Sequence, residues 1–437
     1  MDDRLHEALR AAAAPRGVDD ADRERMRAAV AAARHRRSVR MTVLGAVAAV
    51  LVIVAAGTVL GVVGPDGRDD QTRPAGPSGR DVAPTGDWAP IAASPLAGSA
   101  NAVGVWTGTE LVVAGGEEGP VCPPIADCYR SGTPSAQAAA YDPAADTWRL
   151  LPPAPQPLGP GFGVWLGDRA LLVGAASGVT LLLDPATGTW EQVQDVPGHV
   201  IDGGLVVIPS KDVKDGADDA VRFSYDKRGT ASPDYRFDGA TGTWAPLPAD
   251  PFGESYDRSM AWFDGRLWLL SMAAENHVGA YDGKPSRLAV LEGDRWRVVD
   301  PATPDLTQGQ WLIPQGVLLV AAENSDPPAR NQAYDPATGT WREFVPADHG
   351  HPGLPDAPDA GCLLGAAAAG PAWITAGDRL VSALPPDALE VPRCPGHAAY
   401  QVVAWAGERL ILWGGLPAQD SSEPVNDGLV WVPRRPR

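Results

Sequence analysis

Basic residues, cysteine and phenylalanine are scarce in this sequence. Its 437 residues include 36 Lys and Arg against 54 Asp and Glu, which gives a formal net charge of −18. A protein that binds DNA or RNA needs a basic surface, so this balance argues against a nucleic-acid partner. Glycine (49) and proline (44) are abundant but follow no regular period, which excludes a collagen-like chain.

Sequence motifs of common enzymes are also missing. The chain contains no nucleophile elbow, no phosphate-binding loop and no zinc-hydrolase motif. Residues 211–219 (KDVKDGADD) are acidic but lack the alternation of a calcium-binding EF-hand loop. We expect a solvated acidic loop there, formed by Asp212, Asp215, Asp218 and Asp219. The sequence therefore predicts no cofactor and no metal site.

Residues 41–63 carry no charged side chain. As a helix, residues 42–63 would extend about 33 Å, which is close to the thickness of the hydrocarbon core of a bilayer. Four arginines lie just before this segment, whereas acidic residues predominate just after it. The positive-inside rule therefore predicts a single-pass plasma-membrane protein with a cytoplasmic N-terminus and an extracellular C-terminal part. A cleaved signal peptide is the alternative, although its apolar core is normally shorter.

The segments on either side of this predicted transmembrane helix differ in composition. Residues 1–40 are rich in Ala, Arg and Glu, which predicts a cytoplasmic helical stub. The stub resembles those of actinobacterial membrane proteins, and signalling through it remains an alternative. Residues 64–85 are rich in Pro, Gly and Asp and cannot bury a core, so we expect a disordered linker.

Tryptophan, with fifteen residues, is unusually frequent, and several of these residues end a repeated motif in residues 86–437. In four copies the motif places Tyr, Leu or Phe before Asp, usually followed by Pro, and a Trp follows seven positions after the first residue. A weaker copy with Glu in place of Asp leads from Leu291 to Trp296. An Asp-Pro turn with a Gly at positive φ predicts a hairpin, whose Trp would cover the boundary between neighbouring sheets. The structural residues of the repeat are Trp88, Tyr141, Trp148, Trp190, Trp244, Trp296, Tyr334 and Trp341.

A second predicted hairpin also recurs; it precedes the motif in segments such as 105–116 and forms the front half of the last unit at 404–415. Two hairpins make a four-stranded unit, and the closing tryptophans recur every 42 to 60 residues. This period is typical of the blades of a β-propeller. The paired glycines at 115–116 and 414–415, followed by Tyr141 and Trp148 in the first unit, resemble the kelch repeat, and the resemblance covers residues 86–437.

The number of blades follows from the two ends of this region. The strand at Trp88 has no preceding partner strands, and the last unit ends at Trp431 without a fourth strand. We therefore expect the first strand to complete the last blade, which would remove an open sheet edge. Residues 362–392 would form a degenerate sixth blade. The predicted fold is an all-β, seven-bladed kelch-like β-propeller after the helical stub and the transmembrane helix, with six blades as the alternative.

The four cysteines all follow the predicted membrane span. An extracellular location favours disulfides, and pairing within each local couple is our prediction among three possible connectivities. A zinc site is the alternative, but paired ligands at short spacing and neighbouring histidines are lacking. The predicted bonds join Cys122 with Cys128 and Cys362 with Cys394.

Long connections are predicted between the second and third strands of most units, at residues 117–135, 210–233, 274–286, 323–330 and 416–427. The connections between first and second strands are expected to be tight. Loops on a rigid scaffold usually carry the binding residues. The candidate binding residues are Glu117, Glu118, Asp127, Arg130, Lys211, Glu275, Asn276, His277, Glu323, Asn324 and Arg330.

Two functions are compatible with these predictions. In the first, the domain is a membrane-anchored recognition module that binds an extracellular protein, a glycan or a cell-wall component. In the second, it is an enzyme that acts on a carbohydrate or small metabolite, as the resemblance to galactose oxidases and sialic acid mutarotases allows. Because fold alone does not establish an activity and no catalytic motif is found, the binding module is the preferred hypothesis.

Overall fold

The computed structural model describes most of the chain between Gly86 and Pro433. The described residues are 86–126, 128, 131–197, 203–212, 217–227, 234–273, 286–300, 309–315, 317–322, 332–343, 373–376, 379–382, 390–391 and 394–433. The chain divides into two compact units, Met1–Gly76 and Pro77–Arg437, and all described residues belong to the second. The predicted stub (1–40), transmembrane helix (41–63) and linker (64–85) lie outside them. Among the described residues, no helix is long and apolar enough to span a membrane.

The described part is all-β, with one short 3₁₀ turn, η1 (Ser210–Asp212). Six antiparallel sheets have four strands each. We name each sheet by its first strand, and in the sheet named after β28 (Val402–Ala406) the fourth strand is β1 (Gly86–Pro90), from the start of the described region. The β3 sheet contains β3 (Val103–Trp106), β4 (Leu111–Ala114), β7 (Ala138–Asp142) and β8 (Thr147–Leu150). The β9 sheet contains β9 (Gly161–Trp165), β10 (Ala170–Gly174), β11 (Thr180–Asp184) and β12 (Thr189–Gln192). The β13 sheet contains β13 (Gly203–Ile208), β14 (Asp219–Ser224), β15 (Tyr235–Asp238) and β16 (Thr243–Pro246).

The remaining sheets continue in sequence order. The β17 sheet contains β17 (Ser255–Phe263), β18 (Arg266–Ala273), β19 (Arg287–Glu292) and β20 (Arg295–Val298). The β21 sheet contains β21 (Gly309–Gln315), β22 (Val317–Ala322), β23 (Gln332–Asp335) and β24 (Thr340–Glu343). The β28 sheet contains β28 (Val402–Ala406), β29 (Arg409–Trp413), β30 (Gly428–Pro433) and β1 (Gly86–Pro90). The three-stranded β25 sheet contains β25 (Trp373–Ala376), β26 (Arg379–Ser382) and β27 (Glu390–Val391), within the region predicted as the degenerate unit.

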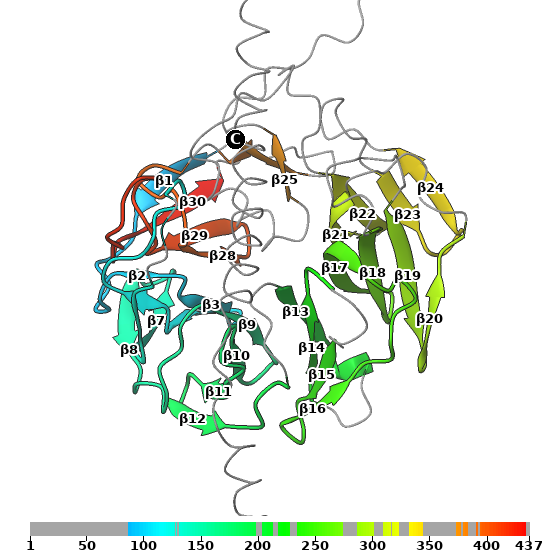
Figure 1. Ribbon diagram of the computed structural model, residues 1–437. Coiled ribbons are helices and arrows are strands. Elements are labelled where there is room, and N and C mark those ends of the chain that lie inside the picture. Colours follow the sequence, from blue (N-terminus) through cyan, green and yellow to red (C-terminus); the bar gives the residue numbers. More distant parts are fainter. Residues whose placement is uncertain are drawn as a thin grey trace, which may run out of the picture. The chain divides into compact units, whose positions relative to one another are not determined.

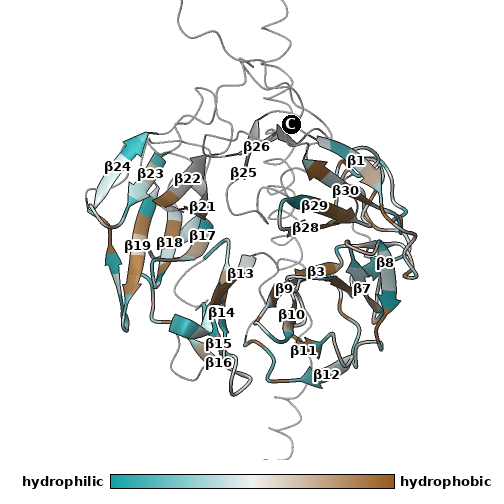
Figure 2. Cartoon of the chain, turned by 180° about the vertical axis from the view of Figure 1, so that it is seen from behind, coloured by the Kyte–Doolittle hydropathy of each residue, from teal (hydrophilic) through white to brown (hydrophobic). Residues whose placement is uncertain are grey.

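Neighbouring sheets pack face to face through their apolar side chains. In Figure 1 the first strands lie toward the middle of the unit and the fourth strands toward its outside, and strands β28, β3, β9, β13, β17 and β21 are neighbours in this order. Second strands such as β4 and β10 are completely buried, and Figure 2 shows β10 coloured as a hydrophobic strand. Val105 of β3 and Leu172 of β10, for example, belong to one buried cluster. The core is therefore divided into layers between sheets.

The turn between third and fourth strands follows its sequence motif. The Asp184 carboxylate accepts hydrogen bonds from the backbone N–H groups of Ala186 (2.9 Å) and Thr187 (3.3 Å), which closes an Asx turn. Gly188 has a φ of 72°, as the motif predicts. In the first unit Asp146 occupies the glycine position at a φ of 51°, and its carboxylate accepts a hydrogen bond from the Tyr141 hydroxyl (2.8 Å).

The closing tryptophans lie in register and join neighbouring sheets. Each faces the first residue of its motif across two paired strands, as Tyr141 faces Trp148, with their ring centroids 5.0 Å apart. The indole N–H of Trp148 donates to the carbonyl of Ala92 (2.9 Å), which follows β1 in the preceding sheet. Trp190 and Trp296 donate equivalent bonds to preceding sheets. Trp148, Trp190 and Trp296 therefore bridge the boundaries between neighbouring sheets, as the repeat predicts.

The first and last strands of the described region pair with each other. Strand β1 is antiparallel to β30, and Trp88 lies opposite Trp431. The Trp431 side chain is completely buried. This pairing, predicted from the missing fourth strand of the last unit, completes the β28 sheet with a segment that lies more than 300 residues away in the sequence.

Two features of the strand pattern differ from the prediction. Residues 210–233 were expected to form one connection between second and third strands, but they contain strand β14. Two connections of equal length result, 209–218 between β13 and β14 and 225–234 between β14 and β15. The expectation that all first-to-second connections are tight is therefore wrong for this sheet. A small additional sheet, made of β2 (Ser99–Ala100), β5 (Glu117–Glu118) and β6 (Thr133–Pro134), was not predicted. Its strands are only two residues long and carry little periodicity.

Candidate functional site

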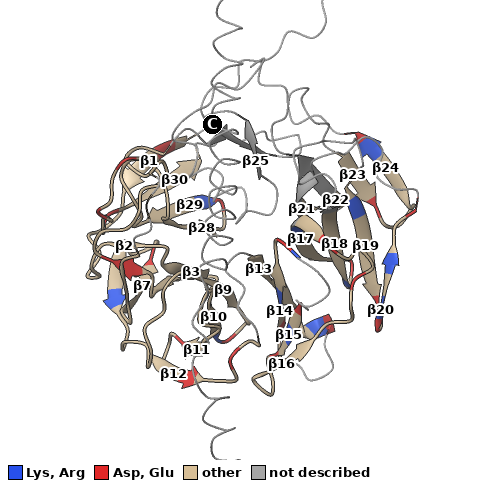
Figure 3. Cartoon of the chain, viewed as in Figure 1, with Lys and Arg blue, Asp and Glu red and all other residues tan. Residues whose placement is uncertain are grey.

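A cavity of about 350 Å³ lies where the first strands of four sheets begin. This is the end of the sheets that carries the connections between second and third strands. No residue that lines it is charged, and the adjacent strands β3 and β9 contain no charged residue, as Figure 3 shows. The side chains are aromatic, amide or small, namely Asn101, Ala102, Pro160, Gly161, Phe162, Ala175, Gly203, Tyr225, Tyr400 and Gln401. The cavity therefore suits a neutral, polar ligand.

Two cavity residues have unusual backbone conformations. Asn101 and Tyr400 have φ values of 57° and 61°, in the left-handed region that residues other than glycine rarely adopt. They lie two positions before β3 and β28, and the Asn101 N–H donates to the Tyr400 carbonyl (2.7 Å). Strain of this kind persists only where the surroundings enforce it, and it concentrates at functional sites.

The paired glycines of the repeat enforce this conformation. A Cβ atom on Gly116 would lie 2.7 Å from the Ala100 carbonyl oxygen and 2.8 Å from Cα of Ala102. A Cβ atom on Gly415 would lie 2.5 Å from the backbone nitrogen of Gln401. Glycine is thus required at both positions so that the segments leading to Asn101 and Gln401 can pack closely.

Amide groups supply the polar contacts of the cavity. The Asn101 Nδ2 atom donates to a carboxylate oxygen of Glu117 (3.0 Å), whose side chain is buried. Because the Asn101 Nδ2 atom faces the carboxylate, the other atom of the same side-chain amide, Oδ1, lies on the side away from it. The Gln401 Oε1 atom is buried and has no hydrogen-bond partner among the described residues. An unpaired buried acceptor is costly, and a ligand that donates a hydrogen bond would remove this cost.

The aromatic ring of Phe162 is held from one side. The guanidinium carbon of Arg222 lies 4.4 Å from the ring centroid, and Arg222 is itself buried and donates a hydrogen bond to the Phe223 carbonyl. This cation–π contact joins the β9 and β13 sheets directly beside the cavity. Phe162 is therefore a fixed aromatic wall.

Few of the loop residues predicted to bind a ligand can be placed. Glu117 and Glu118 lie in β5, and Glu118 accepts hydrogen bonds from the hydroxyl of Ser135 (2.5 Å) and the amide of Gln137 (3.1 Å). Glu117 approaches the cavity only through Asn101. The remaining predicted residues of this group lie outside the described residues, namely Asp127, Arg130, Glu275, Asn276, His277, Glu323, Asn324 and Arg330.

Lys211 belongs to the opposite end of its sheet. It lies in η1, in the connection between β13 and β14, whereas the long connections of the candidate face join second and third strands. The polar ends of strand β14, Asp219 and Ser224, make this strand resemble a loop in the sequence, so Lys211 falls within one long predicted connection. The β14 residues Ala220, Val221 and Phe223 are buried, and this apolar core of the strand was the missed signal.

Asp219 also differs from the expectation of a solvated acidic loop. Its side chain is buried, accepts a hydrogen bond from Arg236 Nε (2.7 Å) and accepts a second from the backbone N–H of Gly239 (2.9 Å). Asp218 accepts from the N–H of Ser210 (2.5 Å). The Asp219 carboxylate links β14 to β15, and the Asp218 carboxylate links the residue before β14 to η1, so the role of both is structural.

A buried ionic network lies next to the cavity end of the β13 sheet and was not predicted. Arg258 contacts Asp234 through two hydrogen bonds (3.0 and 2.6 Å) and Asp250 through one (3.2 Å), and Lys227 contacts Asp250 (2.7 Å). Burial alone would lower the pKa of Arg258, but the hydrogen bond and charge of Asp234, with the charge of Asp250, raise it overall. The two cations and two anions balance, which favours a structural role.

Three of the four cysteines lie among the described residues. Cys122 and Cys128 form a disulfide, with their Cα atoms 5.8 Å apart, so this predicted pairing is confirmed. Cys394 is buried and also disulfide-bonded, and its predicted partner Cys362 lies outside the described residues. In the described part of the chain, no three His, Cys, Asp or Glu side chains are grouped so that they could hold a metal ion.

Comparison with known proteins adds no relative. No protein-family model matches this chain, and no curated protein matches it. The cavity residues and their geometry are therefore the basis for the functional proposal.

Proposed function

We propose that residues 86–437 form a seven-bladed, kelch-like β-propeller. Six four-stranded sheets and one three-stranded sheet, in sequence order, support this proposal. The pairing of β1 with β30 is the arrangement by which a propeller closes its ring of blades. The positive φ angles at Gly115, Gly116, Gly414 and Gly415 suit the double glycines of the kelch repeat.

We further propose that the propeller is an extracellular recognition module held at the plasma membrane by residues 42–63. The charge-free apolar segment and the arginines before it support this topology. The disulfide between Cys122 and Cys128 supports an oxidising compartment, because cytosolic proteins rarely keep such bonds.

The proposed ligand is a neutral glycan of the cell envelope. The observation that carries this proposal is the uncharged cavity, where the aromatic residues Phe162, Tyr225 and Tyr400 alternate with the amides of Asn101 and Gln401. Sugar rings present apolar C–H faces that pack on aromatic side chains, and their hydroxyls pair with amide groups. A cavity of about 350 Å³ is of the size that holds one or two sugar units.

Binding of neutral oligosaccharides to the full chain in detergent micelles tests this function. The probes are immobilised cellohexaose, xylohexaose and chitohexaose, and we expect at least one to bind above the background of a blank surface. Gln401→Leu should weaken that binding about fivefold to tenfold, because the ligand loses a buried amide partner. Gln192→Leu, an exposed amide on an outer strand, is the matched control and should bind as the native chain does. The glycan proposal fails if no probe binds, or if both variants lose the same affinity.

A further inference from the structure

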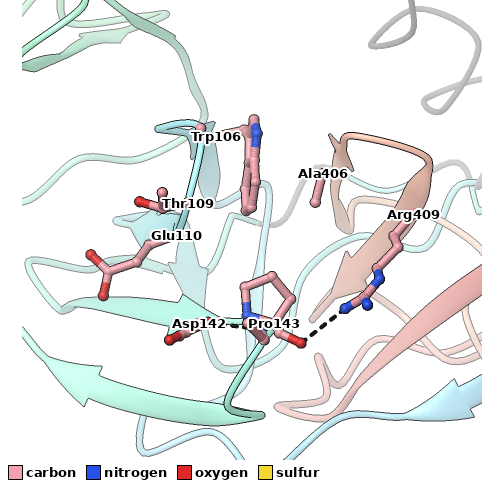
Figure 4. Close-up of a pocket in the computed structure, with 9 residues that line it drawn as sticks. Trp106, Thr109, Glu110, Asp142, Pro143, Ala406 and Arg409 are labelled. Carbon is pink, nitrogen blue, oxygen red and sulfur yellow. Dashed lines mark hydrogen bonds between the residues drawn. The ribbon is translucent and has the colours of Figure 1, made fainter.

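A second cavity, of about 620 Å³, lies at the opposite end of the sheets from the first one. It opens between the β28 and β3 sheets and is lined by the first-to-second turn of each sheet and by the third-to-fourth turn of the β3 sheet. Figure 4 shows the Trp106 indole and the Arg409 side chain on opposite sides of this cavity, with Pro143 below them. Ala406 adds to the apolar wall.

Arg409 is one of three arginines that join neighbouring sheets in the same way. Its Nη1 atom donates to the carbonyl of Pro143 (3.1 Å), directly after the turn aspartate of the next sheet. Arg149 donates to the equivalent carbonyl of Pro185 (3.0 Å), and Arg169 to that of Gly239 (3.2 Å). These bonds explain why arginine is present, but each uses only one or two of the five guanidinium donors.

The three arginines differ in their acidic partners. Arg149 forms two hydrogen bonds with the Glu110 carboxylate (3.1 and 2.9 Å). Arg169 lies 3.4 Å from Glu191 and 3.6 Å from Asp168. Arg409 makes no ion pair with any carboxylate in the described part of the chain, although this chain has a large excess of acidic residues. Arg409 is also one of the residues that line the cavity.

The two carboxylates that border the cavity are already engaged. Glu110 pairs with Arg149, and Asp142 accepts hydrogen bonds from the backbone N–H groups of Ala144 (2.8 Å) and Ala145 (3.2 Å). In Figure 4 both carboxylates point away from Arg409. The cavity therefore offers one uncompensated cation opposite one large aromatic face.

We propose that this cavity binds a ring-shaped ligand that carries a carboxylate, of the class of acidic sugars. The carboxylate accepts two hydrogen bonds from the guanidinium fork of Arg409, and the sugar ring packs on the Trp106 indole. The site is separate from the neutral cavity at the other end of the sheets. An envelope polymer with both neutral and acidic sugars could therefore be bound at two places on one chain.

The test is calorimetric titration of the full chain in detergent micelles with D-glucuronate. D-glucose, the analogue without the carboxylate, is titrated in the same way as the uncharged control. We expect saturable glucuronate binding with a Kd of about 1–10 mM and glucose binding at least tenfold weaker. Arg409→Gln should weaken glucuronate binding about tenfold or more, and Trp106→Leu about fivefold. Failure of glucuronate to saturate below about 50 mM, or equal binding of glucose, would overturn the proposal.

Arg169→Gln is the matched control, because it removes the same bond between sheets at another place. Its thermal unfolding should resemble that of Arg409→Gln, while its glucuronate affinity stays at the native value. Equal loss of affinity in both variants would show that the effect arises from loosened sheets, and the proposal would be wrong. If Arg409→Gln does not fold, Trp106→Leu with native thermal stability and native glucuronate affinity would overturn it as well. A loss of binding to the neutral oligosaccharides in Gln401→Leu is independent of all these outcomes.

Discussion

The β3 and β13 sheets stabilise the connection between their second and third strands by different physical means. In the β3 sheet Gly115 and Gly116 follow the second strand, with φ angles of 68° and 85°. A Cβ atom on Gly115 would lie 2.6 Å from the Leu158 carbonyl oxygen, so the backbones themselves are in contact. The third-strand segment is then held by the bond from the Ser135 N–H to the Gly116 carbonyl (2.9 Å).

In the β13 sheet the residues after the second strand are not glycines. Ion pairs between charged side chains hold the connection there instead. Lys227 pairs through its backbone with Ser255, and its ammonium group contacts Asp250. Arg258 joins Asp250 to Asp234, just before the third strand. A close backbone contact at a glycine is disrupted when a side-chain atom is added. A buried ionic network is disrupted when one charged member is removed, because its partners stay buried without a counter-charge. The two sheets should therefore fail in opposite ways.

The largest expected effect is the loss of one member of the ionic network. Arg258→Met leaves Asp234 and Asp250 buried with Lys227 as their only remaining cation, and we expect unfolding to become easier by about 3–5 kcal/mol. Urea unfolding followed by tryptophan fluorescence measures this change. Arg295→Met removes an exposed arginine and is the control, with a change below about 0.5 kcal/mol. Equal stability of the two variants would contradict the description of the network as buried and coupled.

Gly116→Ala tests the other sheet. The added Cβ meets the Ala100 carbonyl oxygen and also requires an unfavourable φ, so we expect a loss of about 2–4 kcal/mol. Gly108→Ala is the matched control, because its φ is 101° but no atom lies within 4 Å of the added Cβ. It should cost only about 1–2 kcal/mol. The same urea titration separates steric contact from backbone strain, and a control as destabilised as Gly116→Ala would show that contact is unimportant.

A smaller effect is expected for the disulfide in the connection that the glycines fasten. Cys122 and Cys128 lie six positions apart in the sequence, and replacing both with Ser should cost about 2 kcal/mol in the chain-entropy account. The glycine contacts remain, so the β3 sheet should keep its cavity. Binding of the best neutral oligosaccharide should therefore stay within about twofold of the native value. A complete loss of binding in this variant would show that the loop, and not the glycines, shapes the cavity.

The smallest effect concerns the turns between third and fourth strands, which the motif builds alike in the β9 and β21 sheets. A hydrogen bond from the Thr187 hydroxyl lowers the pKa of Asp184, and one from the backbone N–H of Ala337 lowers the pKa of Asp335. A carboxyl group whose pKa is lower in the folded state stabilises the protein above its unfolded pKa, near 3.8, and this contribution disappears as the pH falls through the folded value.

Thermal unfolding between pH 5 and pH 2 measures this contribution, which both turns should share. Asp184→Asn and Asp335→Asn keep the Asx turn but remove the charge, so each variant should flatten the loss of stability on acidification by a similar small amount. The shared motif predicts that the two turns are equivalent. A large difference between the two variants would show that they are not.

The repeat made much of this fold predictable, because its turns depend on local chemistry. The Asp, Gly and Trp of the motif at Asp184, Gly188 and Trp190 specify one turn type and one register, and both were found. The unpaired strand at Trp88 also indicated its partner, since an open edge in a repeat must be filled. Strand β14 was not predicted, because polar residues at both its ends make the segment resemble a loop. Its four central positions, from Ala220 to Phe223, are nevertheless buried.

The candidate sites were much harder to predict, because their residues come from different sheets. Loop residues such as Glu117 were chosen for their charge, whereas the cavity is lined by uncharged residues at the starts of first strands, such as Asn101 and Gln401. Asn tolerates a positive φ better than most residues, so Asn101 gives a weak signal of its conformation, whereas Tyr400 gives none. The partners of Arg258 lie 8 and 24 residues away and reach it only through the packing of two sheets.

The units of this protein could be predicted from its amino-acid pattern: the repeated hairpins, the turn chemistry and the strand that completes the last sheet. Each of these depends on residues that are close in the chain or identical in pattern, so local physics decides them. The pairing of Cys122 with Cys128 was one of three possible connectivities. The packing of the sheets, by contrast, sets which side chains meet between them, including the balanced charges around Arg258 and the unpaired charge of Arg409. Those contacts depend on how one unit packs against the next, and no periodic pattern records that geometry.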